Sequence, residues 1–220
     1  MTRHPLQPLP LTRLSCLSKI VRAPFVFVIL ATVLTLSSCR EEAGEKLSSP
    51  EFTEEEKNRL LKTGREVIED LATTLGARLK KAIAEGGPIE AVKVCQLEAG
   101  PMTDATSGGR EGVKVSRTSL KYRNPENAPD EMDRRILESW QQELAAGNPL
   151  PPLEVVSQDA QTAIVYKPIM LQPLCLNCHG PEDQLLPPLK AVLDDLYPED
   201  KARGFQMGDL RGAFRVEIER

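Results

Sequence analysis

Cys175-Leu176-Asn177-Cys178-His179 is the most informative stretch of the sequence. Two cysteines separated by two residues and followed directly by a histidine form the attachment pattern of c-type haem. The two thiols lie one helical turn apart, which suits addition to the two vinyl groups of a haem, and the adjacent imidazole suits the iron. A thioredoxin-like redox pair needs no histidine here, and a zinc site needs four ligands, or three and a water molecule. The sequence therefore predicts one covalent haem c, attached through Cys175 and Cys178, with His179 as an iron ligand.

The second axial ligand is restricted by the supply of histidine. The chain holds two histidines, and His4 lies in a segment that we expect to be removed. Bis-histidine ligation within one chain is then excluded, which leaves methionine, cysteine, lysine, an amine, water or an open position. Cys95 lies on the apolar face of a predicted helix, where a free cysteine also serves as a small buried hydrophobic residue. Spacing alone favours neither Cys95 nor the methionines, which are Met102, Met132, Met170 and Met207.

The N-terminal segment has the features of an export signal. Residues 1–22 carry four basic and no acidic residues, and Ala23–Leu36 is an uncharged apolar run of 14 residues, short for a membrane span and typical of a secretory signal. The run leads into Ser37-Ser38-Cys39, which resembles the bacterial lipobox. We expect residues 1–38 to be a lipoprotein-type signal peptide and Cys39 to be lipidated, the alternatives being ordinary cleavage with Cys39 incidental or an uncleaved anchor. The protein is then exported and membrane-anchored, facing the periplasm or the cell exterior.

The mature chain is acidic. Without the four basic residues of the leader, 24 Lys and Arg face 32 Asp and Glu, a net charge of −8. Nucleic-acid phosphates would be repelled by such a surface, and the few aromatic residues provide no stacking platform. We therefore expect no nucleic-acid partner. Residues 39–52 are polar and charged and predict a tether, and residues 53–220 predict one domain.

The spacing of apolar residues predicts an α+β fold. A capping box at Thr53 opens a long amphipathic helix that stops at Gly86-Gly87, and Pro88 starts a second helix that ends at Gly100-Pro101. A third helix carries Trp140 and ends at Gly147. Further predicted elements are a helix over Leu189–Leu196 and strands over Val113–Thr118, Leu153–Ser157, Thr162–Ile169 and Ala213–Ile218. This order indicates a long N-terminal helix and an antiparallel sheet with inserted helices.

Several stretches resemble a family of single-haem c-type cytochrome domains with a PAS-like fold and histidine/cysteine ligation of the iron. They follow the family's order and cover most of the chain after residue 88. The resemblance implies a PAS-like sheet, and it places the axial ligands at Cys95 and His179. Two positions depart from the family, Met132 for an aromatic and Arg203 for an apolar residue. The matching stretches are Ala91–Cys95, Arg117–Pro125, Asn127–Asp130, Lys167–Ile169, Leu174–Gly180 and Gly208–Ala213.

Ligation by Cys95 and His179 implies a low-potential haem, because an anionic thiolate stabilises ferric iron. With both axial positions filled, the iron offers no open site for a substrate, so we do not expect an enzyme. We expect electron transfer or redox and gas sensing through a separate partner protein. Of the basic-aromatic cluster near the haem motifs, Arg117, Lys121 and Tyr122 are candidates for pairing with the haem propionates. The alternative is a solvated loop, or strand-end arginines bonded to Asp130 or Asp209.

The sequence leaves two alternative functions open. One is a histidine/methionine electron carrier, and the other is a weakly peroxidase-like or nitrite-reducing haem enzyme. The enzyme would need a labile sixth position and a distal acid or base. The mature chain has no second histidine for that role, and nothing singles out Glu98 or Arg117 for it.

Overall fold

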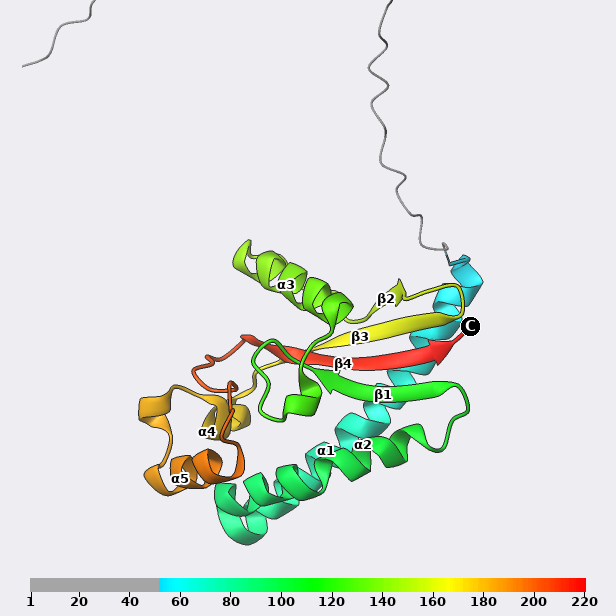
Figure 1. The fold of residues 1–220 in the computed structure, drawn as a ribbon. Coiled ribbons are helices and arrows are strands. Elements are labelled where there is room, and N and C mark those ends of the chain that lie inside the picture. Colours follow the sequence, from blue (N-terminus) through cyan, green and yellow to red (C-terminus); the bar gives the residue numbers. More distant parts are fainter. Residues whose placement is uncertain (1–51) are drawn as a thin grey trace, which may run out of the picture. The chain divides into compact units, whose positions relative to one another are not determined.

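The computed structural model describes residues 52–220, which belong to one compact unit. The predicted signal peptide, Cys39 and all but the last residue of the tether lie outside the described residues. The unit is built on a four-stranded antiparallel sheet in the order β1-β4-β3-β2 (Figure 1). The strands are β1 (Val113–Thr118), β2 (Glu154–Ser157), β3 (Thr162–Met170) and β4 (Leu210–Glu219). The predicted α+β class, with an antiparallel sheet and a long N-terminal helix, is confirmed.

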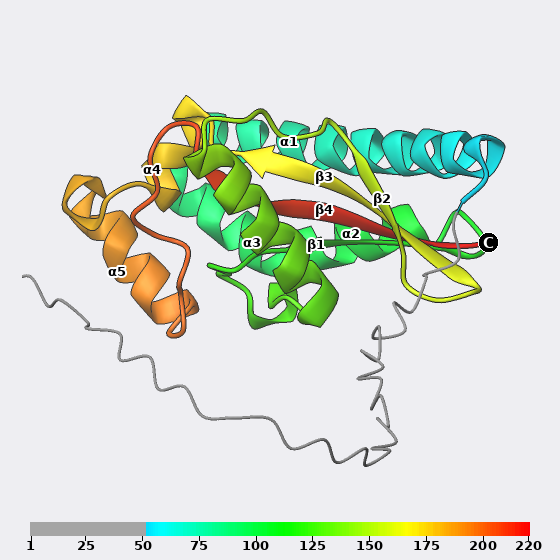
Figure 2. The ribbon, with the colours of Figure 1, turned by 90° about the horizontal axis from the view of Figure 1, so that it is seen from above.

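Helices cover both faces of this sheet (Figures 1 and 2). The helix α1 (Glu54–Leu97) lies on one face and α3 (Glu131–Ala145) on the other. Alternation along the strands explains the two layers, since successive side chains point to opposite faces. On β3, Val165 packs against α1, while Ile164 and Tyr166 pack against α3. Shorter elements are α2 (Ala99–Ser107), α4 (Leu176–His179), α5 (Pro187–Leu196) and the 3₁₀ turns Pro125–Asn127, Pro173–Cys175 and Glu182–Gln184.

The first part of α1 forms as its sequence predicts. The Thr53 hydroxyl accepts a hydrogen bond from the Glu56 amide at 3.2 Å, and so satisfies one of the free donors of the first turn. The apolar stripe then packs on the sheet. Gly64 allows a close approach, because a Cβ at this position would lie 2.6 Å from a Val165 methyl group. The fully buried residues of the stripe are Leu60, Val67, Ile68 and Leu71.

A sharp break divides α1 into an outbound arm and a return arm. Gly87 has φ 72°, a conformation that suits glycine, and Pro88 opens the return arm. The two arms pack through the buried Ala82 and Ala91. The predicted stop at Gly86-Gly87 and the start at Pro88 are thus confirmed as a break within one element.

The predicted end of the return arm is wrong in one respect. Gly100 and Pro101 do not end helical structure but lie in the first turn of α2, which continues to Ser107. Proline is tolerated there, because first-turn amides lack a partner within the helix. The bend falls two residues before Gly100, at Glu98, which also accepts two hydrogen bonds of 2.6 Å from Arg78 on the outbound arm.

The other face of the sheet is held to α3 by a buried polar network. The Tyr166 hydroxyl donates to an Asp133 carboxylate oxygen at 2.6 Å, and Arg215 Nε donates to the same oxygen at 2.9 Å. Burial and the neighbouring Asp133 raise the pKa of Tyr166 well above its usual range, so the hydroxyl stays protonated. Asp133 also completes a capping box with Asp130 at the start of α3.

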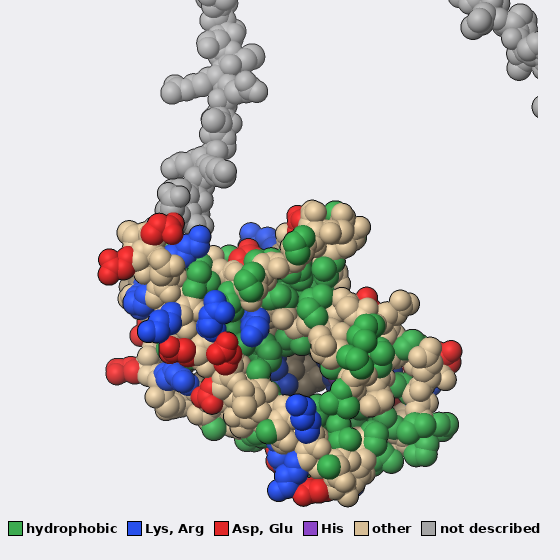
Figure 3. All heavy atoms as spheres, turned by 180° about the vertical axis from the view of Figure 1, so that it is seen from behind, with side chains coloured by type: hydrophobic (Ala, Val, Ile, Leu, Met, Phe, Trp, Pro, Cys, Tyr) green, Lys and Arg blue, Asp and Glu red, His purple; other side chains and the backbone are tan. Residues whose placement is uncertain are grey.

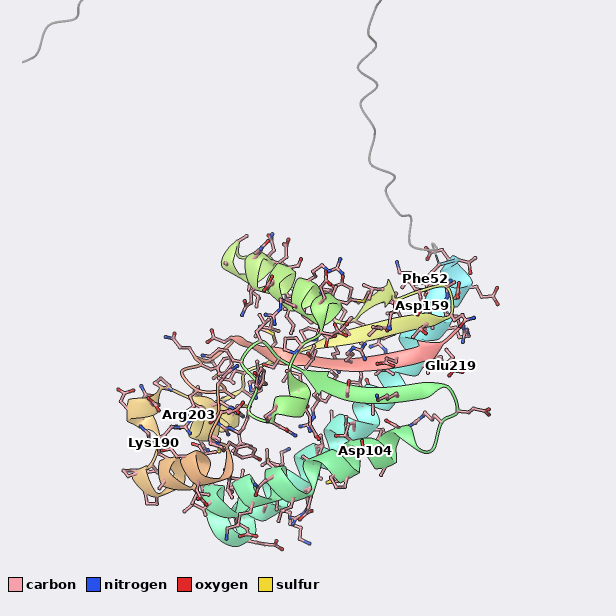
Figure 4. All side chains as sticks on the ribbon, in the orientation of Figure 1. Phe52, Asp104, Asp159, Lys190, Arg203 and Glu219 are labelled. Atoms are coloured by element: carbon pink, nitrogen blue, oxygen red, sulfur yellow. The ribbon has the colours of Figure 1, made fainter. Side chains whose placement is uncertain are left out.

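The segment between β3 and β4 carries α4 and α5 and lies at one end of the sheet (Figure 1). The strands β1 and β3 end there and β4 begins there, so three strand ends meet the short helices. Leu189 and Leu193 of α5 pack on Val92 of the return arm. Arg203 and Lys190 lie at this end, and Phe52 and Glu219 lie at the other (Figure 4). Within residues 52–220, no helix is both long and apolar enough to span a membrane.

Candidate functional site

The cysteine pair lies on a single short helical turn. Cys175 precedes α4 and Cys178 lies within it, so the two thiols are one turn apart on one element. Both side chains are half-buried. The turn closes with a hydrogen bond of 3.0 Å from the Gly180 amide to the Leu176 carbonyl. A Cβ at residue 180 would lie 2.6 Å from that carbonyl oxygen, so glycine is required directly after His179.

The imidazole of His179 is oriented by the backbone. Its Nδ1 lies 2.7 Å from the Ala202 carbonyl oxygen. A carbonyl only accepts hydrogen bonds, so Nδ1 carries the proton and Nε2 keeps its lone pair. This is the arrangement of a metal-binding histidine, whose second ring nitrogen donates to a carbonyl or a carboxylate. Burial, together with the charges of Arg211 and Arg123, lowers the pKa of His179 to about 3, so the ring is neutral.

A loop after α5 supports this orientation. Its backbone runs beside the histidine, with hydrogen bonds of 3.0 Å from the Phe205 amide to the His179 carbonyl and 2.9 Å from the Gly204 amide to the Gly180 carbonyl. The carboxylate of Asp200 accepts from the Ala202 amide at 2.9 Å, which fixes the residue whose carbonyl holds the imidazole.

Two arginines hold Asp200 in place. Arg123 Nε donates to it at 3.1 Å and Arg203 Nε at 2.8 Å, and Arg123 also donates to the Cys178 carbonyl at 2.6 Å. Burial raises the pKa of Asp200, but the bonds from Arg123, Arg203 and the Ala202 amide outweigh it, so the net pKa is lowered and the carboxylate stays ionised. The sequence analysis missed Asp200 and Ala202, because their roles depend on contacts between distant segments.

Two cavities meet at the cysteine pair and the histidine. The larger has a volume of about 300 Å³ and the smaller about 140 Å³. The walls of both include Cys95, Cys175 and His179, together with Leu79. A hollow is visible in Figure 3 beside the end that carries α4 and α5, with basic side chains at its rim and hydrophobic side chains around it.

Cys95 reaches this site from the return arm of α1, whereas Cys178 and His179 belong to α4. Its side chain is exposed and lines both cavities. Burial raises the pKa of the Cys95 thiol, and the charges of Arg117 and Arg123 partly offset this effect. The structure therefore brings together a free imidazole nitrogen and a thiol from two separate elements, next to the two thiols of α4.

The methionine alternatives separate into two groups. Met102 and Met170 line the larger cavity with Cys95 and His179. Met132 packs in the core between α3 and the sheet, and Met207 is 58% exposed on the surface. The geometry thus leaves Cys95, Met102 and Met170 beside His179.

The three residues suggested as propionate contacts have different positions. Arg117 of β1 lines the larger cavity. Lys121 and Tyr122 do not line either of these cavities. The Lys121 ammonium donates to the Arg203 carbonyl at 2.5 Å, and the Tyr122 hydroxyl accepts from Lys201 at 2.6 Å. A cation that the sequence analysis did not single out, Arg211 of β4, also lines the larger cavity, and it lies in the matching stretch Gly208–Ala213.

Comparison with known proteins identifies the family. The sequence pattern described as Tll0287-like matches residues 33–219. The chain belongs to the Tll0287-like family. Among solved structures, a crystal structure described as that of the cyanobacterial haem protein Tll0287 has the same fold, with a TM-score of 0.54 and 24% sequence identity over 77% of this chain and 98% of that one. No curated protein matches the chain. The family resemblance found in the sequence is thereby confirmed.

Proposed function

We propose that this chain is a haem-binding redox protein, with one haem attached covalently to Cys175 and Cys178 and ligated axially by His179 and Cys95. One observation carries the proposal. Cys95 and His179 come from separate elements and line the same two cavities, with the histidine Nε2 unprotonated. The Tll0287-like relative of solved structure is described as a haem protein, which supports the same cofactor here.

The residues around the larger cavity fit a flat, anionic group. Gly76 lies within the outbound arm of α1 and lines this cavity, and a Cβ there would meet no atom within 4 Å. A mid-helix glycine costs about 0.5–1 kcal/mol relative to alanine, so its place beside an open cavity suggests that the space serves a bound group. The Arg117 Nε is buried without a hydrogen-bond partner in the described part of the chain. A haem would account for both features, because its flat ring would occupy the space beside Gly76 and its carboxylates would accept a hydrogen bond from Arg117.

The ligand set supports one-electron chemistry. A bound haem supplies an iron that gains and loses one electron, and thiolate ligation favours its ferric form. The chain contributes the two ligands, the fixed tautomer of His179 and largely apolar walls. Because both axial positions would be filled, no open position is offered to a substrate, and we propose electron transfer at low potential rather than catalysis.

Sensing is a second candidate, favoured by the position of Cys95. Cys95 lies on the return arm of α1 and not on α4. The Gly87 break and the Arg78–Glu98 hydrogen bonds connect this arm to the outbound arm. Reduction weakens an iron–thiolate bond, so an arm able to withdraw Cys95 would open a position for CO or NO. Carbon monoxide binding to the reduced protein separates the two candidates, since a pure electron carrier would not bind it.

We further propose that the protein is exported and lipid-anchored at Cys39 and works with a separate redox or signalling partner. The apolar run before Cys39 supports this proposal. The test is to replace Cys39 by Ala in the full chain and to compare membrane and soluble fractions of the producing cells. Release of the Cys39→Ala protein from the membrane fraction is expected, and unchanged membrane attachment would contradict lipidation at this residue.

The ligation is tested by spectra of the full chain produced in a host that matures c-type haem. The wild type is expected to be low-spin ferric with thiolate absorption in the near-ultraviolet, and Cys95→Ala is expected to lose both features. Met102→Ala and Met170→Ala are matched controls, because both methionines line the same cavity. A spectrum that changes in a methionine variant and not in Cys95→Ala would transfer the ligand role to that methionine. Absence of covalent haem would overturn the proposal altogether.

A further inference from the structure

Within the described part of the chain, two arginines on the wall of the larger cavity lack a negatively charged partner. Arg117 comes from β1 and Arg211 from the start of β4. Neither forms a salt bridge within residues 52–220. The Arg117 Nε is buried and has no hydrogen-bond partner there. Arg211 donates only to neutral oxygens, the Ser119 hydroxyl at 2.8 Å and the Lys121 carbonyl at 3.0 Å.

The neighbouring arginines, in contrast, form salt bridges with carboxylates. Arg123 pairs with Asp200, and Arg203 pairs with three carboxylates, those of Glu182, Asp194 and Asp200. Burying a cation without a counter-charge is costly, and such groups are normally paired. Arg117 and Arg211 are therefore exceptions within a region that pairs its other arginines.

Both guanidinium groups remain charged despite their surroundings. Burial lowers the pKa of Arg211 to about 10 and also lowers that of Arg117, which the nearby Cys95 partly offsets. The cavity wall thus carries two positive charges at neutral pH. A ligand that brings two carboxylates would compensate both charges.

We infer that Arg117 and Arg211 form a dicarboxylate-binding site on the wall of the larger cavity, made for the two propionates of the bound porphyrin. The inference rests on the proposed function and assigns a part of the site that the sequence left open. Guanidinium groups suit this role, because their parallel N–H donors match a carboxylate. Lys121 and Tyr122 have no part in it, since their polar atoms bond to the Arg203 carbonyl and to Lys201.

The experiment measures reversible porphyrin binding by the full chain with Cys175→Ser and Cys178→Ser, which removes covalent attachment. Haemin and its dimethyl ester are titrated in parallel, since the ester has two neutral methyl ester groups in place of the two charged carboxylates. The protein is expected to bind haemin at least about tenfold more tightly than the ester. Arg117→Gln and Arg211→Gln are each expected to lose most of that preference, and Arg117→Lys to keep part of it. Lys121→Gln is the matched control and is expected to keep all of it.

Stability without porphyrin gives an independent readout. Because Arg117 is an unpaired cation in this state, Arg117→Met is expected to raise the melting temperature while it weakens haemin binding. An arginine with a structural role would lower the melting temperature instead. Equal binding of haemin and ester, or loss of the preference in Lys121→Gln alone, would overturn the dicarboxylate site. Failure to bind either porphyrin would overturn the proposed function, and the site with it.

Discussion

Replacing Asp200 by Asn is expected to destabilise the haem-free full chain by about 3 kcal/mol, the lower end of the range for breaking a buried ion pair. The Asp200 side chain is 2% exposed, and its partners Arg123 and Arg203 are 10% and 12% exposed. Asparagine keeps the size of the side chain and removes its charge, so Arg123 loses its ionic partner. Arg203 keeps Glu182 and Asp194, which is why we expect the lower end.

Urea unfolding measures this loss, and the chain provides a matched control. Asp194 pairs with the same Arg203 at 2.7 Å, but its side chain is 55% exposed. Exposed ion pairs contribute about 0–1 kcal/mol, so Asp194→Asn is expected to fall in that range. Equal losses in Asp194→Asn and Asp200→Asn would refute the argument that burial decides the cost.

The pH dependence of the Asp200→Asn effect follows from the lowered pKa of Asp200. An aspartate in the unfolded chain titrates near about pH 3.9. Because the folded pKa is lower, the stabilisation by Asp200 is fully present above that pH and is lost as the pH falls through the folded pKa. The difference in unfolding free energy between wild type and variant should stay constant from about pH 5 to 8 and shrink below about pH 4. A difference that shrinks already between pH 5 and 8 would contradict this assignment.

Four further substitutions test the glycines of α1 and the buried network. Gly87→Ala is expected to lower the unfolding free energy by about 1–3 kcal/mol, because Gly87 combines a positive φ with an extended ψ of −168°. Gly76→Ala, inside a helix arm, should raise it by about 0.5–1 kcal/mol in the same urea titration; a loss in both variants would contradict this reasoning. Gly76→Leu should project a side chain into the larger cavity, so that the protein folds but incorporates less haem, as measured by its absorption spectrum; haem incorporation at the wild-type level would refute the fit. Tyr166→Phe should cost about 1.5–3 kcal/mol in thermal unfolding, because the hydroxyl donates to the Asp133 carboxylate that also pairs with Arg215; an unchanged melting temperature would show that the contact with Arg215 is sufficient for Asp133.

The sequence predicted those parts of the fold that depend on local patterns. Apolar spacing located the two arms of α1, and Gly86-Gly87-Pro88 located the break between them. Strand alternation located all four strands within a few residues. The helix α2 escaped prediction because Gly100-Pro101 ends a helix in most contexts, while here the same pair lies in a first turn.

The candidate site could be predicted only in part, for a physical reason. The pattern Cys175–His179 is local, so the proposed attachment and one proposed ligand could be predicted from the sequence alone. The proposed second ligand depends on tertiary packing, which brings Cys95, Met102 and Met170 to one cavity. Cys95 alone of the three also lines the smaller cavity with His179, and the family resemblance favours it as well. The same limit applies to the cations, since Lys121 lies only three residues beyond the end of β1 and yet turns away from the cavity that Arg117 lines.

The break at Gly87 has a consequence for how this architecture can vary. Because both arms of one helix line the larger cavity, the spacing of its walls depends on how closely the arms pack. That distance is set by the side chains at their contact, here Ala82 and Ala91. Ala82 is fully buried and lines neither cavity. A larger residue at position 82 would move the arms apart and widen the cavity without contacting a group bound in it. The size of the cavity can therefore change through a residue that does not line it.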